Sequence, residues 1–96
     1  MYCDNIYFSE HALIKMAQRG IEPEEVEAVI KKGETIKTYP DDQPDPSYLL
    51  LGLVNEKVLH VVVCKDVLYE NCIVITVYQP DPEIWEPDFK NKKSKP

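Results

Sequence analysis

The spacing of the hydrophobic residues changes at Gly33, and this change restricts the chain to few folds. Before Gly33, apolar residues recur every three or four positions, which indicates amphipathic helices. After it, short apolar runs are separated by turn residues, which is typical of strands. Helices followed by a run of strands predict an α+β domain, with the helices packed on one face of an antiparallel sheet.

Two helices are predicted before this change. The first covers residues 10–19, because Ser9 suits an N-cap and Gly20 suits the left-handed residue that ends a helix. The second begins at Pro23, which is tolerated at a first helical position, and ends at Gly33. Because the connection between them is short, we expect the two helices to pack as a hairpin.

About four strands are predicted after the change, at residues 35–39, 48–54, 58–64 and 72–78. Residues 1–7 are interpreted as a lead-in to the first helix, and the proline-rich residues 40–46 as a loop. The second and third strands contain runs that are apolar on both faces, so we expect them to be central. The C-terminal tail or a partner chain would then cover the second face of the sheet.

The length and the charge of the chain limit its possible functions. We place a single domain at residues 1–89 and a basic, flexible tail at residues 90–96. The net charge of −6 argues against broad, non-specific binding of nucleic acid, so an RNA phosphate would need a local site. No apolar run reaches the roughly 20 residues of a membrane span, so no membrane association is predicted. Residues 1–7 also lack the apolar core of a signal peptide.

The three cysteines, Cys3, Cys64 and Cys72, show no C-x-x-C spacing. Cys64 and Cys72 lie in apolar strand-like runs, where cysteine usually acts as a small buried hydrophobe. The pattern predicts neither a disulfide framework nor a zinc site, and it favours a reducing compartment and a cytoplasmic location. No phosphate-binding glycine loop, nucleophile motif or other metal-ligand spacing is visible, so no cofactor is expected.

Three basic side chains recur along the first predicted helix. His11, Lys15 and Arg19 are spaced at i, i+4 and i+8, which places them within about 80° of arc on one side of the helix. Such a face could hold an anion beside a group that transfers a proton near neutral pH. The alternative is an ordinary solvated helix face, since helix surfaces are usually charged.

A second set of polar residues is predicted on the sheet. Strand alternation places Thr76 and Tyr78 on one face of the last strand, where they are candidates to line a cleft with His60. The alternatives are a buried histidine that donates to a backbone carbonyl, and two ordinary strand residues. Trp85, further along the chain, is interpreted as an anchor for the C-terminal segment.

The chain resembles the prokaryotic family known as domain of unknown function 4258. The resemblance rests on the residues FSEHA at 8–12, RGI at 19–21, LHVVV at 59–63 and ITVY at 75–78. That family is similar to the RelE/ParE-type toxins, which implies a helical hairpin packed on a small antiparallel sheet. Some of those toxins cut messenger RNA, others poison gyrase, and some are inactive. The resemblance also implies that His11, Arg19 and His60 occupy recurring polar positions, with Lys15 where an arginine is more common.

Two functions follow from these observations. The first is a toxin-like, metal-independent ribonuclease, in which His11 and His60 act as acid and base and four residues bind the substrate: Lys15, Arg19, Thr76 and Tyr78. It requires both imidazoles to open into one cleft. The second is a non-catalytic protein-interaction module on the same RelE-like scaffold. Its partner would be an antitoxin-like protein or a second copy of the chain, covering the apolar sheet.

Overall fold

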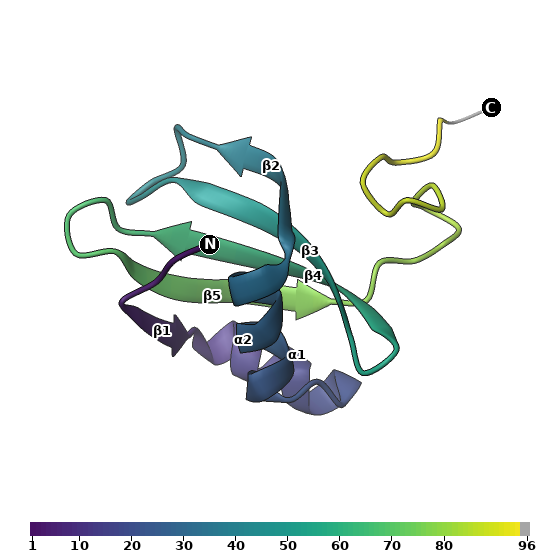
Figure 1. Ribbon diagram of the computed structural model, residues 1–96, viewed down its shortest axis with the longest axis horizontal. Coiled ribbons are helices and arrows are strands. Elements are labelled where there is room, and N and C mark those ends of the chain that lie inside the picture. Colours follow the sequence, from purple (N-terminus) through teal and green to yellow (C-terminus); the bar gives the residue numbers. More distant parts are fainter. Residues whose placement is uncertain (95–96) are drawn as a thin grey trace.

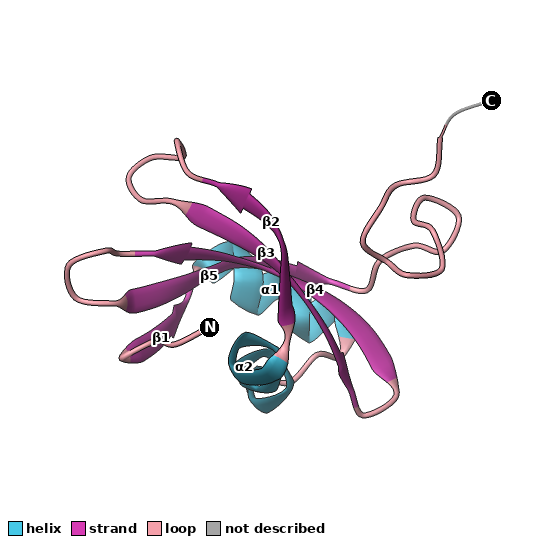
Figure 2. Cartoon of the chain, turned by 45° about the horizontal axis from the view of Figure 1, so that its top comes forward, coloured by secondary structure: helices cyan, strands magenta, loops and turns pink. Residues whose placement is uncertain are grey.

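Two helices lie against one face of a five-stranded sheet in the computed structural model, which describes residues 1–94 (Figures 1 and 2). The elements are β1 (Asn5–Phe8), α1 (Glu10–Arg19), α2 (Pro23–Lys32), β2 (Glu34–Tyr39), β3 (Ser47–Val54), β4 (Lys57–Lys65) and β5 (Asn71–Tyr78). The predicted α+β class is therefore confirmed. Among the described residues, no helix has the length and apolar character needed to cross a membrane.

The sheet is mixed, with the strand order β1-β5-β4-β3-β2. The four predicted strands are present as β2 to β5, and each neighbouring pair among them is antiparallel. The interpretation of residues 1–7 as a lead-in is wrong, because β1 pairs in parallel with the first half of β5. This strand has only four residues, which is too short for a reliable alternation pattern.

The two predicted helices have the expected bounds and ends. The Ser9 hydroxyl accepts a hydrogen bond from the backbone N–H of Ala12 at 3.0 Å, and Gly20 closes α1 with a φ of 64°. Pro23 opens α2, and Gly33 follows its last residue. The residues at the helix ends therefore predicted the bounds of both helices, as expected when capping groups satisfy the backbone groups that a helix leaves free.

The hydrophobic core lies between the helices and the inward face of the sheet. Ala12 and Met16 of α1 pack with Val29 of α2 and with residues of the three central strands, including Leu50, Leu59, Val61, Val63 and Val74. Gly52 of β3 lets α2 approach the sheet closely, since a Cβ there would lie 2.8 Å from Val29 Cγ2. The opposite face of the sheet, which we call the outer face, has no helix on it (Figure 2).

A β-bulge changes which residues of β5 face the core. The register between β4 and β5 shifts between Val62 and Val63, so Val74 and Val77 both enter the core. Simple alternation would place Val74 on the same face as Thr76, but the bulge adds one residue to β5 and puts the two side chains on opposite faces. Beyond the bulge, Tyr78 pairs opposite His60, which puts both side chains on the outer face.

A disulfide joins Cys3 to Cys72, with a Cα–Cα distance of 5.7 Å. The expectation of no disulfide is therefore wrong for these two residues. It failed because the parallel pairing of β1 with β5 brings the N-terminal segment to Cys72, and no local pattern in residues 1–7 predicted that pairing. Cys64 is free and buried, as predicted. Cytoplasmic location loses the support of the cysteine pattern and stays a prediction.

Candidate functional site

The structure brings together three of the six predicted site residues on the outer face. His60 of β4 pairs opposite Tyr78 of β5, and Thr76 lies two residue pairs further along, opposite Val62. On the other side of His60, Leu51 of β3 is its cross-strand neighbour. Cross-strand neighbours on one face have Cβ atoms about 5 Å apart, so these side chains form one continuous surface.

His60 is completely buried, and both of its ring nitrogens are hydrogen-bonded. Nε2 lies 2.8 Å from the carbonyl oxygen of Phe89, and Nδ1 lies 3.1 Å from the Tyr78 hydroxyl. Because a carbonyl can only accept, Nε2 carries the proton and donates it, and the Tyr78 hydroxyl donates to Nδ1. For a neutral imidazole, these contacts therefore correspond to one tautomer, with the proton on Nε2.

The burial of this pair also sets its protonation. Burial lowers the pKa of His60, although the hydrogen bond to the Phe89 carbonyl partly opposes this change. Burial raises the pKa of Tyr78, and the Tyr39 phenol adds to the effect. His60 is therefore neutral and Tyr78 protonated near neutral pH. An uncharged, bonded pair whose imidazole has no solvent access holds a structure together and is poorly placed to exchange protons with a substrate.

The cover of His60 is a C-terminal segment, residues 80–93, which we call the strap. The Trp85 indole packs edge-on against the imidazole, with 4.5 Å between ring centroids, and is 6% exposed. Trp85 therefore anchors the segment, as predicted. Lys90 of the strap pairs with Glu34 of β2 at 2.9 Å, so the strap reaches across the sheet from β5 to β2. In Figure 1 the strap forms a separate coil beside one end of the sheet.

The strap has internal structure of its own. The backbone N–H of Glu86 donates to the carbonyl of Asn91, and that of Lys93 donates to the carbonyl of Ile84, both at 2.8 Å. A groove of ≈ 500 Å³ separates the strap from the β3–β4 hairpin and is lined in part by Leu53, Val58 and Phe89. Residues 90–93 of the predicted flexible tail belong to this folded segment. Residues 95–96 of the predicted tail lie outside the described residues, and the domain boundary at residue 89 stays a prediction.

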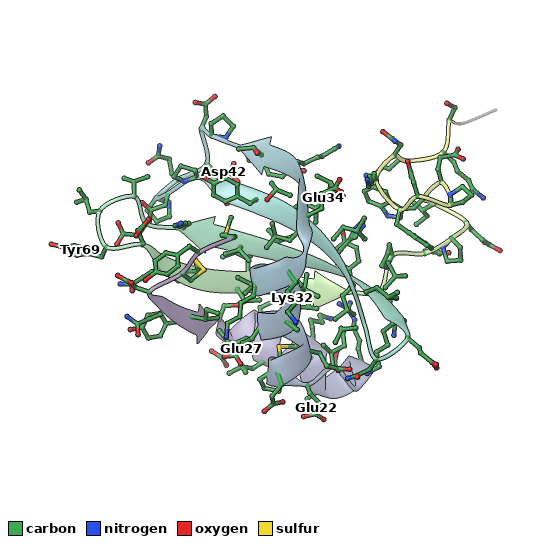
Figure 3. All side chains as sticks on the ribbon, in the orientation of Figure 1. Glu22, Glu27, Lys32, Glu34, Asp42 and Tyr69 are labelled. Atoms are coloured by element: carbon green, nitrogen blue, oxygen red, sulfur yellow. A yellow bond between two sulfur atoms is a disulfide. The ribbon has the colours of Figure 1, made fainter. Side chains whose placement is uncertain are left out.

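The strap covers only one end of the outer face. At the other end, Tyr7 of β1 is 54% exposed and Ile73 of β5 is 41% exposed. Figure 3 shows Tyr69, in the connection between β4 and β5, pointing away from the domain at that end. The complete burial of His60 is therefore a local effect of the strap, rather than a property of the whole face.

The predicted basic face of α1 is not part of this surface. His11 is exposed, Lys15 is half-buried, and the Arg19 guanidinium donates to the Val77 carbonyl at 2.6 Å. The helices occupy the core side of the sheet and His60 occupies the outer side, so the sheet lies between the two imidazoles. The structure does not bring His11 and His60 into one cleft, which the paired acid–base mechanism requires.

The sequence did not reveal the backbone carbonyl of Phe89 as the partner of His60. Any residue can supply a backbone carbonyl, so this acceptor cannot be recognised from the residue type. The aromatic residues of the proline-rich C-terminal segment were the only sequence feature that indicated a contact there. Within residues 1–94, no three His, Cys, Asp or Glu side chains are grouped so that they could hold a metal ion.

Residues 8–79 match a family model described as "Domain of unknown function (DUF4258)". The match includes α1, α2 and strands β2 to β5, and it ends before the first residue of the strap. No curated protein and no solved structure matches the chain.

Proposed function

Since the chain belongs to the family described as "Domain of unknown function (DUF4258)", which carries no activity in its description, we propose a function from the geometry of the outer face. The domain is a protein-interaction module on a RelE-like scaffold that binds an extended, aromatic-bearing peptide segment. The observation that carries this proposal is the complete burial of His60 by the strap, which lies outside the matched residues 8–79.

The outer face has the features of a peptide site. His60 offers an N–H to a peptide carbonyl, and the apolar side chains of Leu53 and Val58 line the adjoining groove. Peptide sites commonly combine backbone hydrogen bonds, which give affinity, with pockets that select side chains. The strap supplies a matching carbonyl from Phe89 and an indole from Trp85. An antitoxin-like protein or a second copy of the chain would supply an equivalent segment.

A peptide corresponding to residues 80–93 should bind the full-length Trp85→Ala variant, whose own strap lacks its anchor. We expect binding to the wild type to be at least about tenfold weaker, because the tethered strap competes at a high effective concentration. Fluorescence anisotropy of the labelled peptide measures both affinities. Ile84→Ala is the matched control, since Ile84 is adjacent in the strap but 51% exposed, and it should behave like the wild type.

A second peptide, in which alanine replaces the tryptophan, tests the specificity of the site. It should bind the Trp85→Ala variant at least about tenfold more weakly, because aromatic anchors dominate the energetics of such interfaces. Circular dichroism must show the wild-type fold in each variant. The absence of saturable binding of the unchanged peptide to a folded Trp85→Ala protein would refute the proposal.

The ribonuclease function would use the same scaffold, with RNA as the partner. The observation that favours this function is the grouping of His60, Thr76 and Tyr78 on the outer face of the sheet. The basic residues of α1 are not part of that face. We expect the His11→Ala variant and the wild type to leave a labelled RNA equally intact, since the exposed His11 has no second imidazole beside it. A cleavage rate that falls more than tenfold in His11→Ala would restore the ribonuclease function.

A further inference from the structure

The contact between the strap and the sheet depends on the protonation of one imidazole. His60 binds both sides of the contact, through the Tyr78 hydroxyl on β5 and the Phe89 carbonyl on the strap. The Trp85 ring then covers the imidazole edge-on. His60 is fully buried in this arrangement, whereas His11, the only other histidine of the chain, is exposed.

A second proton on His60 would make this arrangement unfavourable. Nδ1 would become a donor, so the Tyr78 hydroxyl would have to accept from it and turn its own hydrogen away, without a partner. The imidazolium would also be buried, and a buried charge without a partner is strongly unfavourable. A released strap would instead leave the imidazolium in water. Protonation therefore favours the open strap.

The charged groups near the ring do not provide a counter-ion. On the strap, the Asp88 carboxylate accepts from the backbone N–H groups of Lys90 and Asn91, and Lys90 pairs with Glu34 of β2. Lys92 lies over the Trp85 ring at 5.7 Å and adds another positive charge. The sheet neighbours of His60 are the apolar Leu51 of β3 and the uncharged Tyr78 of β5. Among the described residues, no carboxylate contacts the imidazole.

The strap can leave the sheet without losing its own structure. Its hydrogen bonds between Glu86 and Asn91 and between Lys93 and Ile84 are internal, so release of the strap does not require them to break. Apart from the contacts around His60, the Lys90–Glu34 ion pair joins it to the sheet with largely exposed side chains, and Phe89 lines the groove beside Leu53 and Val58. Exposed ion pairs contribute little to stability. The contacts around His60 are therefore the part of this attachment that protonation can change.

We propose that His60 is a pH-dependent latch, whose protonation releases the strap from the outer face. This regulation rests on the proposed function of that face. The closed strap is stable above the ordinary histidine pKa of 6.5 and loses stability as the pH falls below it, because burial lowers the pKa of His60 in the closed form. The ratio of open to closed strap then rises by up to about tenfold per pH unit until the pKa of the closed form is reached.

Trp85 is the only tryptophan of the chain, so its fluorescence reports the strap directly. In the full-length wild type, acrylamide quenching of Trp85 should rise several-fold between pH 8 and pH 5, while far-ultraviolet circular dichroism stays constant. The His11→Gln variant should show the same transition. In His60→Gln the quenching should be independent of pH, whether its strap is open or closed. A flat wild-type profile, a transition that persists in His60→Gln, or unfolding of the sheet with the same midpoint would each overturn the latch.

Peptide binding separates failure of the latch from failure of the proposed function. The labelled peptide of residues 80–93 should bind the Trp85→Ala variant about tenfold more weakly at pH 5.5 than at pH 7.5, because it makes the same contacts as the strap and is disfavoured by the same protonation of His60. If Trp85 becomes accessible at low pH and the peptide does not bind a folded Trp85→Ala variant at pH 7.5, the peptide site is refuted and the latch stands. If the peptide binds Trp85→Ala at pH 7.5 and wild-type Trp85 does not respond to pH, the latch is refuted and the site stands.

Discussion

Replacing Cys3 by serine should lower the free energy of unfolding by about 4 kcal/mol, because the bond between Cys3 and Cys72 closes a long loop. The two residues are 69 positions apart, so the bond removes much conformational freedom from the unfolded chain. It also fastens the segment before β1, a four-residue edge strand whose only sheet neighbour is β5. Unfolding in urea, followed by circular dichroism, measures the change.

A reducing agent provides the control for this prediction. It should destabilise the wild type by about as much as the substitution does, and it should leave the Cys3→Ser variant unchanged. Cys64→Ala tests for a general effect of losing a thiol, since Cys64 is free and buried, and it should keep the sensitivity to reductant. Equal stability of oxidised and reduced wild type would show that the bond does not support the fold.

Replacing Glu25 by glutamine should lower the free energy of unfolding by about 2 kcal/mol, because its carboxylate accepts three hydrogen bonds in a buried position. Oε1 accepts from the Glu22 backbone N–H at 2.9 Å and from Lys57 Nζ at 3.0 Å, and Oε2 accepts from Asn55 Nδ2 at 2.9 Å. Glutamine removes the negative charge and one of the two acceptor oxygens. The substitution therefore weakens the link between the start of α2 and the β3–β4 hairpin.

The effect of Glu25→Gln should depend on pH. The hydrogen bonds from the Glu22 backbone, Asn55 and Lys57 lower the pKa of Glu25 to about 2 from the ordinary value of 4.5. A lowered carboxylate pKa stabilises the fold above pH 4.5, and this stabilisation is lost as the pH falls from 4.5 to 2. The two proteins should thus differ at pH 7 and converge near pH 2. Glu24→Gln, at an exposed neighbouring position, should match the wild type throughout.

Features determined by neighbouring residues were predictable from the sequence. The Ser9 cap and the glycine after Arg19 located α1, and the alternation along β4 put His60 on the face that it occupies. Features determined by distant residues were not predictable. The parallel pairing of β1 with β5, the disulfide and the cover of His60 by Phe89 join segments from different parts of the chain.

The same distinction explains the outcome for the candidate site. Helical spacing grouped His11, Lys15 and Arg19 on α1, but it carries no information on which side of the sheet the helix packs. Arg19 in turn bonds to the backbone of β5, a role that side-chain chemistry alone does not distinguish from phosphate binding. The roles of these residues toward a ligand stay predictions.

The contacts of α1 with β5 also bear on the solubility of the protein. Beyond the end of β1, the Ser9 hydroxyl donates to the carbonyl of Ile75 and Arg19 donates to that of Val77. Unpaired carbonyls at a sheet edge are the groups through which strands of separate molecules join into aggregates. The helix therefore blocks polymerisation along β5, and a variant of Arg19 that precipitates would have exposed this edge. The opposite edge strand, β2, carries Lys37 at an exposed position, and a charge there disfavours the pairing of this strand with a strand of another molecule.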